Sequence, residues 1–193
     1  METEAIKKVK KKINKVIVQS SFPEEPFHSI NTLEWLLKLK PDSDIALQIA
    51  ALGHDIERAF DGKRVRSTDF DTYDEYKQAH ALNSAEIITE LMEECGIEQK
   101  LIDDVARLVA HHEMGGDERE EVLKNADSIS FFHVSLPLYY DRKGPDITRK
   151  RCVWGYKKLP DHLKKVVAEF EYMDQELLQL LRESLDFEYQ KNR

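Results

Sequence analysis

The sequence lacks several features that define large classes of proteins. No stretch approaches the roughly 18 consecutive apolar residues that a membrane-spanning helix needs, so no membrane span is expected. The first residues contain two glutamates and no apolar segment, which argues against a secretory signal. Only two cysteines are present, Cys95 and Cys152, far apart in the chain, so a disulfide framework is not expected. These absences favour a cytoplasmic protein with reduced thiols.

Positive charge is also in short supply. The 29 Lys and Arg residues are outnumbered by 37 Asp and Glu residues, which gives a formal net charge of −8. A negative chain is a poor ligand for nucleic acid, so we do not expect nucleic acid as a partner. Six lysines gather within residues 7–15, but apolar residues at three- and four-residue steps predict an amphipathic helix over 2–20. These lysines are therefore expected to form its solvated face.

Glycine is scarce, and the hydrophobic pattern has a helical period almost throughout, with no run of period-two alternation. The pattern predicts one all-α domain over residues 1–193, a helical bundle with its core motif at about 28–130 and C-terminal helices at about 147–188. The helices are expected at about 2–20, 28–40, 44–57, 72–94, 98–112, 118–134, 147–158 and 161–188, with a loop at 58–71. The almost wholly apolar helix 44–57 should be the buried centre of the bundle.

The predicted last helix, 161–188, carries a continuous apolar stripe from Leu163 to Leu185. At helical spacing such a stripe belongs to a core or to an interface with a partner. A homodimer is therefore compatible with the sequence.

Five of the seven histidines lie where predicted helices begin or end: His28, His54, His80, His111 and His112. Helix ends are places where side chains from separate elements can converge on one point. Two acids complete the pattern. Asp55 directly follows His54, and Asp127 lies between apolar residues in the predicted helix that follows His112, where a carboxylate is costly unless it is paired or bound to a metal. Imidazole and carboxylate together suit one or two divalent transition metal ions such as Mn, Fe, Co, Ni or Zn.

The order of these residues resembles the HD superfamily, which is defined by the sequence His … His-Asp … Asp. The segment AALGHDI is similar to the helix that ends in the family's metal-binding pair, and HALNSAEIITELMEECGI and VARLVAHHEMGG are similar to the segments that carry further ligands in its two-metal members. The resemblance covers about residues 28–130. It implies that His28, His54, Asp55 and Asp127 hold a first metal.

A second metal would be held by His80 and by His111 or His112, with Asp55 bridging the two ions. The alignment of the helix ends slightly favours His112, although some relatives use both histidines. Because these ligands come from separate helix ends, folding would assemble the site.

Most members of the superfamily are metal-dependent phosphohydrolases, so the resemblance implies hydrolysis of a nucleotide or another small phosphate ester. The metal would lower the pKa of a bound water towards about 7. Asp55 would be catalytic as the shared ligand. Arg58, three residues later, would act in catalysis and substrate binding as a phosphate clamp. Lys63 and Arg64, on the following loop, are further candidates for binding the substrate phosphate.

Three other acids lie near the motif. Glu57 is one position short of the general base that some relatives use, so we do not assign it that role. We expect Glu86 at the helix surface or beside a ligand. Glu113 could orient its neighbour His112, but a solvated acid is the better interpretation.

Two other functions fit the same ligand set. A minority of HD proteins hold two irons and activate O₂, so a di-iron oxygenase is one alternative. A non-catalytic metal-binding regulatory module is the other. Cleavage of cyclic dinucleotides is not indicated, because the Gly-Tyr-Pro that follows the motif in that branch is missing after Glu113.

Overall fold

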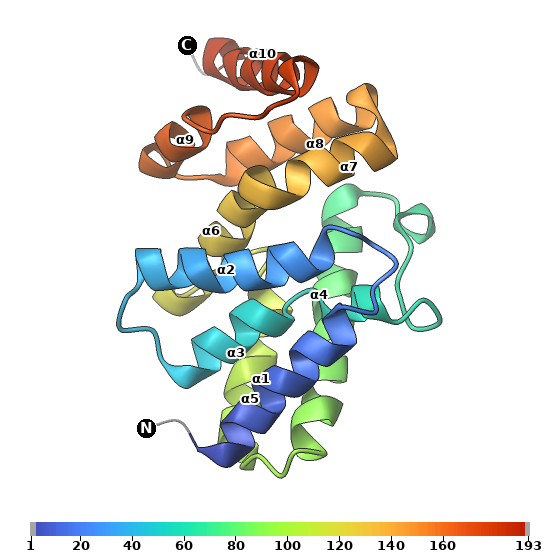
Figure 1. Cartoon of the computed structure of the whole chain (residues 1–193), viewed down its shortest axis with the longest axis vertical. Helices are drawn as coiled ribbons and strands as arrows, with labels where there is room; N and C mark the ends of the chain where they lie inside the picture. The colour runs from blue at the N-terminus through green and yellow to red at the C-terminus, as the bar shows by residue number, and fades with distance from the viewer. Residues whose placement is uncertain (1–2, 192–193) are drawn as a thin grey trace. The chain divides into compact units, whose positions relative to one another are not determined.

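The computed structural model describes the backbone of residues 3–191 and the side chains of residues 3–185. All regular structure within these bounds is helical, and no strand occurs there, so the predicted all-α class is confirmed (Figure 1). The contacts divide the chain into two compact units, with the boundary between Asp127 and Ser128 inside helix α6 (Glu118–Ser130).

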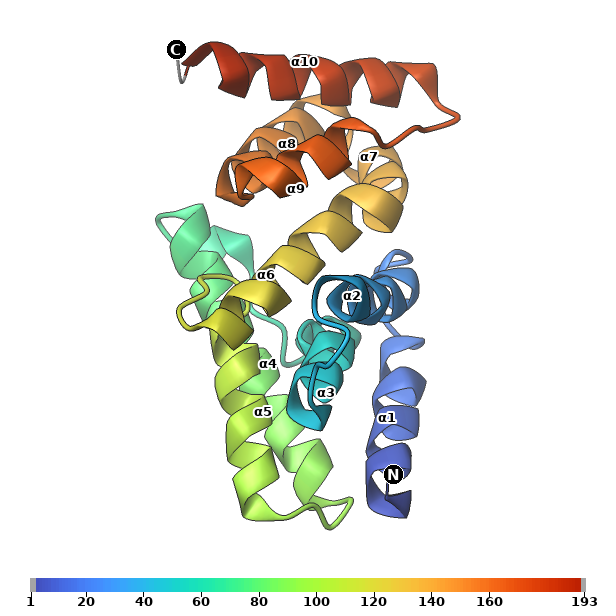
Figure 2. The same ribbon diagram turned by 90° about the vertical axis from the view of Figure 1, so that its left-hand side faces the viewer.

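The first unit contains most of the helices. They are α1 (Glu4–Ile17), α2 (Glu25–Leu39), α3 (Ile45–Gly53), the 3₁₀ turns η1 (Ile56–Ala59) and η2 (Ser67–Asp69), α4 (Tyr73–Glu93), α5 (Gln99–His111) and the start of α6. Helices α4 and α5 lie side by side, and α3 contacts α1, α2 and α5 (Figure 2).

Capping side chains define where three of these helices begin. The hydroxyl of Thr3 accepts from a backbone N–H of α1, Asp44 accepts from Leu47 N at 2.9 Å in α3, and Thr72 forms a reciprocal capping box with Glu75 in α4. Each cap satisfies a backbone donor that has no partner within its own helix, worth about 1 kcal/mol.

Helix α3 is the buried centre of this unit, as the sequence predicted. Its apolar residues contact α1, α4 and α5 in one core, which includes Ile13, Leu47, Ile88, Met92 and Leu108. Each of these side chains is fully buried, and such burial stabilises the fold by roughly 1.5–3 kcal/mol per residue. The helix is shorter than predicted, because it ends at Gly53 rather than at 57.

The second unit contains the end of α6, a π-helical turn η3 (Phe131–Ser135), α7 (Leu136–Lys143), α8 (Pro145–Lys158), α9 (Asp161–Ala168) and α10 (Gln175–Lys191). Helix α8 packs against α7 and α10. Pro137 does not break the chain into a loop. It lies in the first turn of α7, which continues from the π-helical turn η3 without a break.

The predicted single helix at 161–188 is wrong. The chain leaves the helix after Ala168 and begins α10 at Gln175, where the carboxylate of Asp174 accepts from the backbone N–H groups of Glu176 and Leu177. The apolar stripe is therefore split between two helices. Its member Met173 is fully exposed between them, whereas the leucines of the first turns of α10 are buried.

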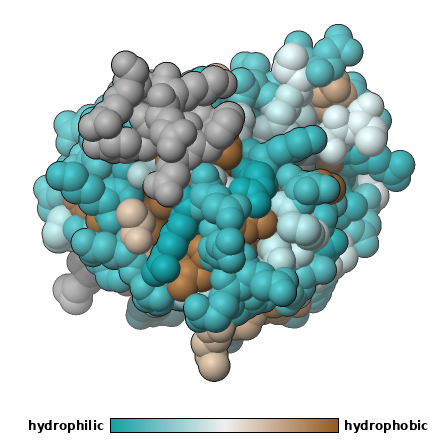
Figure 3. All heavy atoms as spheres, turned by 90° about the horizontal axis from the view of Figure 1, so that it is seen from above, coloured by the Kyte–Doolittle hydropathy of each residue, from teal (hydrophilic) through white to brown (hydrophobic). Residues whose placement is uncertain are grey.

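The described helices do not combine the length and the apolar character that a membrane span needs. None of them is long and apolar enough to cross a bilayer. On the face seen from above, hydrophilic side chains dominate and hydrophobic residues show between them (Figure 3).

Candidate metal centre

The predicted ligands come together in the first unit, three of them near helix ends and His80 in the interior of α4, although the sequence placed His80 at a helix end. His28 lies in the first turns of α2, His54 is the C-cap of α3, and Asp55 occupies the turn before η1. His80 lies within α4, and Asp127 lies in α6.

A further predicted ligand, His112, lies where α5 ends. His112 is the C-cap of this helix, and Glu113 lies in the turn that follows. Gly115 closes the turn with a φ of 73°, and its N–H donates to the carbonyl of His111 at 2.8 Å. A residue with a Cβ is strained in this conformation, so glycine makes the turn possible just after the buried side chains of His112 and Glu113.

One group of donors consists of His28, His54 and Asp127, all buried. Nε2 of His28 is 2.9 Å from Oδ1 of Asp127, and Nε2 of His54 is 3.5 Å from the same oxygen. The two imidazole nitrogens are 3.2 Å apart. All three ligand atoms lie within 4.8 Å of one another, so they could hold a single metal ion.

A second group consists of Asp55, His80, His112 and Glu113, again all buried. Oδ1 of Asp55 is 2.6 Å from Nε2 of His80 and 3.6 Å from Nε2 of His112. The carboxylate of Glu113 approaches the same nitrogen of His112 at 3.4 Å. Its four ligand atoms also lie within 4.8 Å of one another.

Asp55 lies between the two groups. While its Oδ1 faces His80 and His112, its Oδ2 lies 3.7 Å from Nε2 of His28 and 3.7 Å from Nε2 of His54. One carboxylate thus presents an oxygen to each set of imidazoles. This is the arrangement that a carboxylate shared by two cations requires.

Hydrogen bonds on the far side of the rings set which nitrogen faces the centre. Nδ1 of His54 lies 3.0 Å from the carbonyl oxygen of Ala51, and Nδ1 of His112 lies 2.7 Å from that of Val109. Because a carbonyl only accepts, both Nδ1 atoms carry a proton. Metal-bound histidines have such partners, which leave Nε2 as the ligand atom.

The donor set fits a divalent transition metal. Nε2 of His112 is buried and makes no hydrogen bond within the described residues, which is costly for a polar atom unless a cation completes its environment. The connected buried network contains five carboxylates and two cations: Glu25, Asp55, Glu57, Glu113, Asp127, Arg58 and Lys77. Imidazole with carboxylate selects Mn, Fe, Co, Ni or Zn over a purely oxygen-bound ion such as Ca²⁺.

The electrostatics of the centre keep Asp55 and Asp127 ionised. Burial would raise the pKa of Asp55, but the guanidinium of Arg58 and the imidazoles of His54 and His80 outweigh it and hold the pKa well below its ordinary value. In the same way, hydrogen bonds from His28 and His54 outweigh burial and hold the pKa of Asp127 well below its ordinary value. Both carboxylates are therefore in the form that binds a cation.

The surroundings of the His112 imidazole favour positive charge on its ring. Burial opposes a charged imidazole, but the carboxylates of Asp55 and Glu113 outweigh it and raise the pKa of His112 to about 10. A metal ion at Nε2 would meet the same favourable field, since a proton and a metal compete for the same lone pair.

Two acids that the sequence did not assign to the centre are part of it. Glu113 is 4% exposed and pairs with the ammonium of Lys77, so its expected role as a solvated acid is wrong. Glu57 is fully buried, and its Oε1 accepts from Nδ1 of His80 at 2.6 Å. Glu57 therefore orients the ring of His80. Neither role has a local sequence signal, because both depend on the packing of α4.

The two adjacent histidines differ in burial. His112 is buried in the centre, whereas the side chain of His111 is 51% exposed and pairs with Glu120 at 3.0 Å. Glu86 is exposed on α4, which agrees with the first of the two positions expected for it, the helix surface.

The predicted phosphate-binding residues have different positions. Nη1 of Arg58 contacts Oδ2 of Asp55 at 2.7 Å and a carboxylate oxygen of Glu25, so this guanidinium belongs to the centre. Lys63 pairs with Glu90 at 3.1 Å, and Arg64 contacts Asp61, Ser21 and the ring of Phe22. The structure does not bring these two cations to the metal ligands.

These features define a class: an all-helical protein with a buried centre of histidines and carboxylates that could hold metal. Residues 3–181 match a family described as "Domain of unknown function (DUF4202)", and the chain belongs to that family. No curated protein and no solved structure matches the chain.

Proposed function

We propose that this protein is a metal-dependent phosphohydrolase of the HD type, acting on a nucleotide or another small phosphate ester. The observation that carries the proposal is the position of Asp55, whose two oxygens face two separate groups of buried imidazoles. Sharing one carboxylate between two cations is a common feature of sites that hold and hydrolyse phosphate esters.

Divalent ions bound there would supply a Lewis acid and a water of lowered pKa. The chain's own residues prepare the site for these ions. Asp55 and Asp127 stay ionised, and the backbone carbonyls behind His54 and His112 hold the Nδ1 proton of each ring, so Nε2 is the nitrogen that would bind metal in place of a proton. Burial of these donors excludes bulk water from the centre, which strengthens every electrostatic interaction within it.

Arg58 is the residue best suited to orient the substrate. Its guanidinium is held at the centre by Asp55 and Glu25, and its side chain keeps 22% of its surface exposed. A planar guanidinium with several N–H donors matches two oxygens of a phosphate group. Substrate binding by Lys63 and Arg64 stays a prediction, and it would require their loop to change partners.

The proposal is tested by assaying phosphate release. The purified protein is supplied in turn with Mn²⁺, Co²⁺, Ni²⁺ and Mg²⁺ and offered a panel of nucleotides and phosphate esters. We expect metal-dependent release that is lost in His54→Ala and Asp55→Ala and kept in His111→Ala, the matched histidine outside the centre. Release that survives in both centre variants would contradict the proposal.

The same preparation distinguishes the two alternatives. Two bound irons with O₂ consumption and no phosphate release would indicate a di-iron oxygenase, since these ligands accept several metals. Bound metal with neither activity would indicate a regulatory module.

A further inference from the structure

Lys77 and Glu113 form an ion pair that is almost completely shielded from water. Their side chains are 3% and 4% exposed, and the ammonium contacts Oε1 of the carboxylate. Lys77 lies in α4, and Glu113 lies in the turn after α5. A buried pair of this kind adds little net stability by itself, because removing two charges from water costs about as much as their attraction returns. Its position therefore calls for another explanation.

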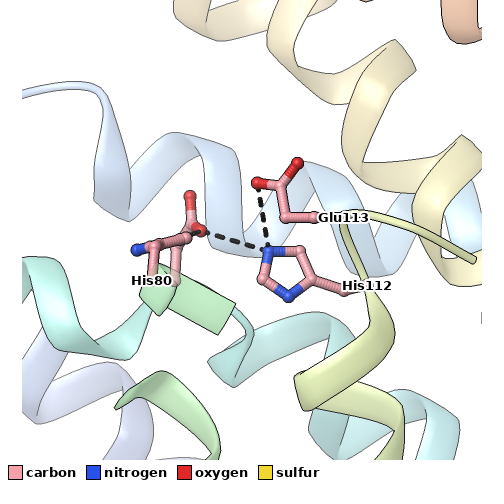
Figure 4. Close-up of side chains that lie close together, drawn as sticks. His80, His112 and Glu113 are labelled. Carbon is pink, nitrogen blue, oxygen red and sulfur yellow. Dashed lines mark hydrogen bonds and ion pairs between the residues drawn. The ribbon is translucent and has the colours of Figure 1, made fainter. Parts of the chain in front are cut away.

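The pair lies at the second group of donors. Oε1 of Glu113 is 3.4 Å from Nε2 of His112, and Nε2 makes no hydrogen bond within the described part of the chain. Figure 4 shows the carboxylate of Glu113 directed at a ring nitrogen of His112. One carboxylate oxygen of Glu113 lies within 4.8 Å of ligand atoms of Asp55, His80 and His112.

We propose that Glu113 is a ligand of the metal position formed by Asp55, His80 and His112, and that Lys77 is the residue that positions its carboxylate. The assignment rests on the metal centre and does not depend on the reaction carried out there. It gives this position two carboxylate and two imidazole ligands, a set that suits a divalent transition metal.

The geometry of α4 explains how Lys77 performs this role. Lys77 precedes His80 by three residues, so both side chains lie on the same face of the helix. The ligand His80 and the cation that holds Glu113 are thus fixed by one rigid element. A buried carboxylate needs a cation, and the ammonium of Lys77 is in direct contact with Glu113.

The first test is a metal titration of Glu113→Gln, which keeps the shape of the side chain and removes its charge. Mn²⁺ binding to the full chain is followed by calorimetry, and Glu118→Gln on the surface is the matched control. We expect two binding steps in the wild type and the control. In Glu113→Gln one step should weaken by at least ~10–100-fold, the loss typical of disturbed metal sites.

Two unchanged steps in Glu113→Gln would overturn the assignment and leave the proposed phosphohydrolase untouched. No binding step in the wild type would overturn both. Metal binding as expected without phosphate release would leave the assignment standing and overturn only the function.

The second test separates positioning from ordinary ion pairing. In Lys77→Met the carboxylate of Glu113 loses the ammonium that contacts it, so the melting temperature should fall in chelator and be restored largely by Mn²⁺. Lys77→Arg, which keeps the charge, should need less rescue. The part of this rescue that exceeds the rise Mn²⁺ gives the wild type should disappear in Lys77→Met/Glu113→Gln. If Mn²⁺ raises the melting temperature of Lys77→Met no more than that of the wild type, Glu113 is not a metal ligand.

Discussion

Oδ1 of Asp55 lies 2.6 Å from Nε2 of His80, although the residues are 25 positions apart in the chain. Asp55 follows α3, whereas His80 lies two turns inside α4, so the contact exists only when these helices are packed together. The centre and the fold of the first unit are therefore coupled, and a metal bound there would stabilise the packed state.

Metal should raise the stability of the wild-type protein. An ion that binds only the folded chain adds about 2.7 kcal/mol at a concentration 100 times its Kd. In a chain of this size each kcal/mol shifts the melting temperature by roughly 2–4 °C. Calorimetric melting in chelator and in Mn²⁺ measures the shift. His54→Ala should lose much of it, and an unchanged wild-type melting temperature would argue against a metal centre.

Glu57→Gln should weaken metal binding without removing a ligand. The carboxylate accepts from Nδ1 of His80 at 2.6 Å, and losing such a partner typically costs ~10–100-fold in affinity. A Mn²⁺ titration measures the effect. Glu86→Gln, on the exposed face of α4, which also carries His80, is the control. Equal affinities in the two variants would show that Glu57 does not orient His80.

The adjacent histidines should behave differently on substitution. His112→Ala removes a buried ligand and should abolish binding at one metal position. His111→Ala removes only a half-exposed partner of Glu120, so it should cost less than about 1 kcal/mol and leave metal binding intact. Metal content and melting temperature of the two proteins provide the comparison. The opposite pattern would mean that His111 is the ligand.

Gly53 should be intolerant of a side chain. A Cβ built there would lie 2.4 Å from Cδ1 of the buried Ile88, so Gly53→Ala forces a shift in the core next to His54. Overpacking of this kind costs roughly 1–3 kcal/mol. Ile88→Val removes the colliding methyl group and should recover much of the loss in the double variant. Additive losses in denaturant unfolding would contradict this steric account.

The thiol of Cys152 should be unreactive in the folded protein. Burial raises its pKa to about 12, so the thiolate is rare at pH 8. Between the ordinary thiol pKa and this raised value, the unfolded chain loses a proton that the folded chain keeps, so stability should fall as the pH rises there. In Cys95→Ala, thiol labelling should be slow until denaturant is added. Rapid labelling of the folded protein would contradict the burial.

The histidines and aspartates of the centre could be predicted as candidate ligands because their sequence signals are local. A histidine or aspartate at a helix end is visible in the sequence, and His28, His54 and Asp127 meet as the order of the motif implied. The buried helix around Leu47 was equally clear, because nearly all its neighbours are apolar. These features depend on the residues themselves and on their spacing.

The rest depends on packing between distant segments. Glu113 resembles a surface acid until the position of Lys77 on α4 is known, and the same holds for Glu57 and His80. The break before α10 did have a local signal, since Asp174 is a good N-cap. It was hidden by the apolar period that continues through Phe170 and Met173.

The most direct test of the account is the metal content of the wild-type chain and of Asp55→Ala. Both proteins are loaded with Mn²⁺, freed of excess metal and measured by elemental analysis. Because Asp55 presents an oxygen to each group of imidazoles, we predict two ions per chain in the wild type and loss of both in Asp55→Ala. A wild type without metal, or a variant that binds as much as the wild type, would contradict the central claim.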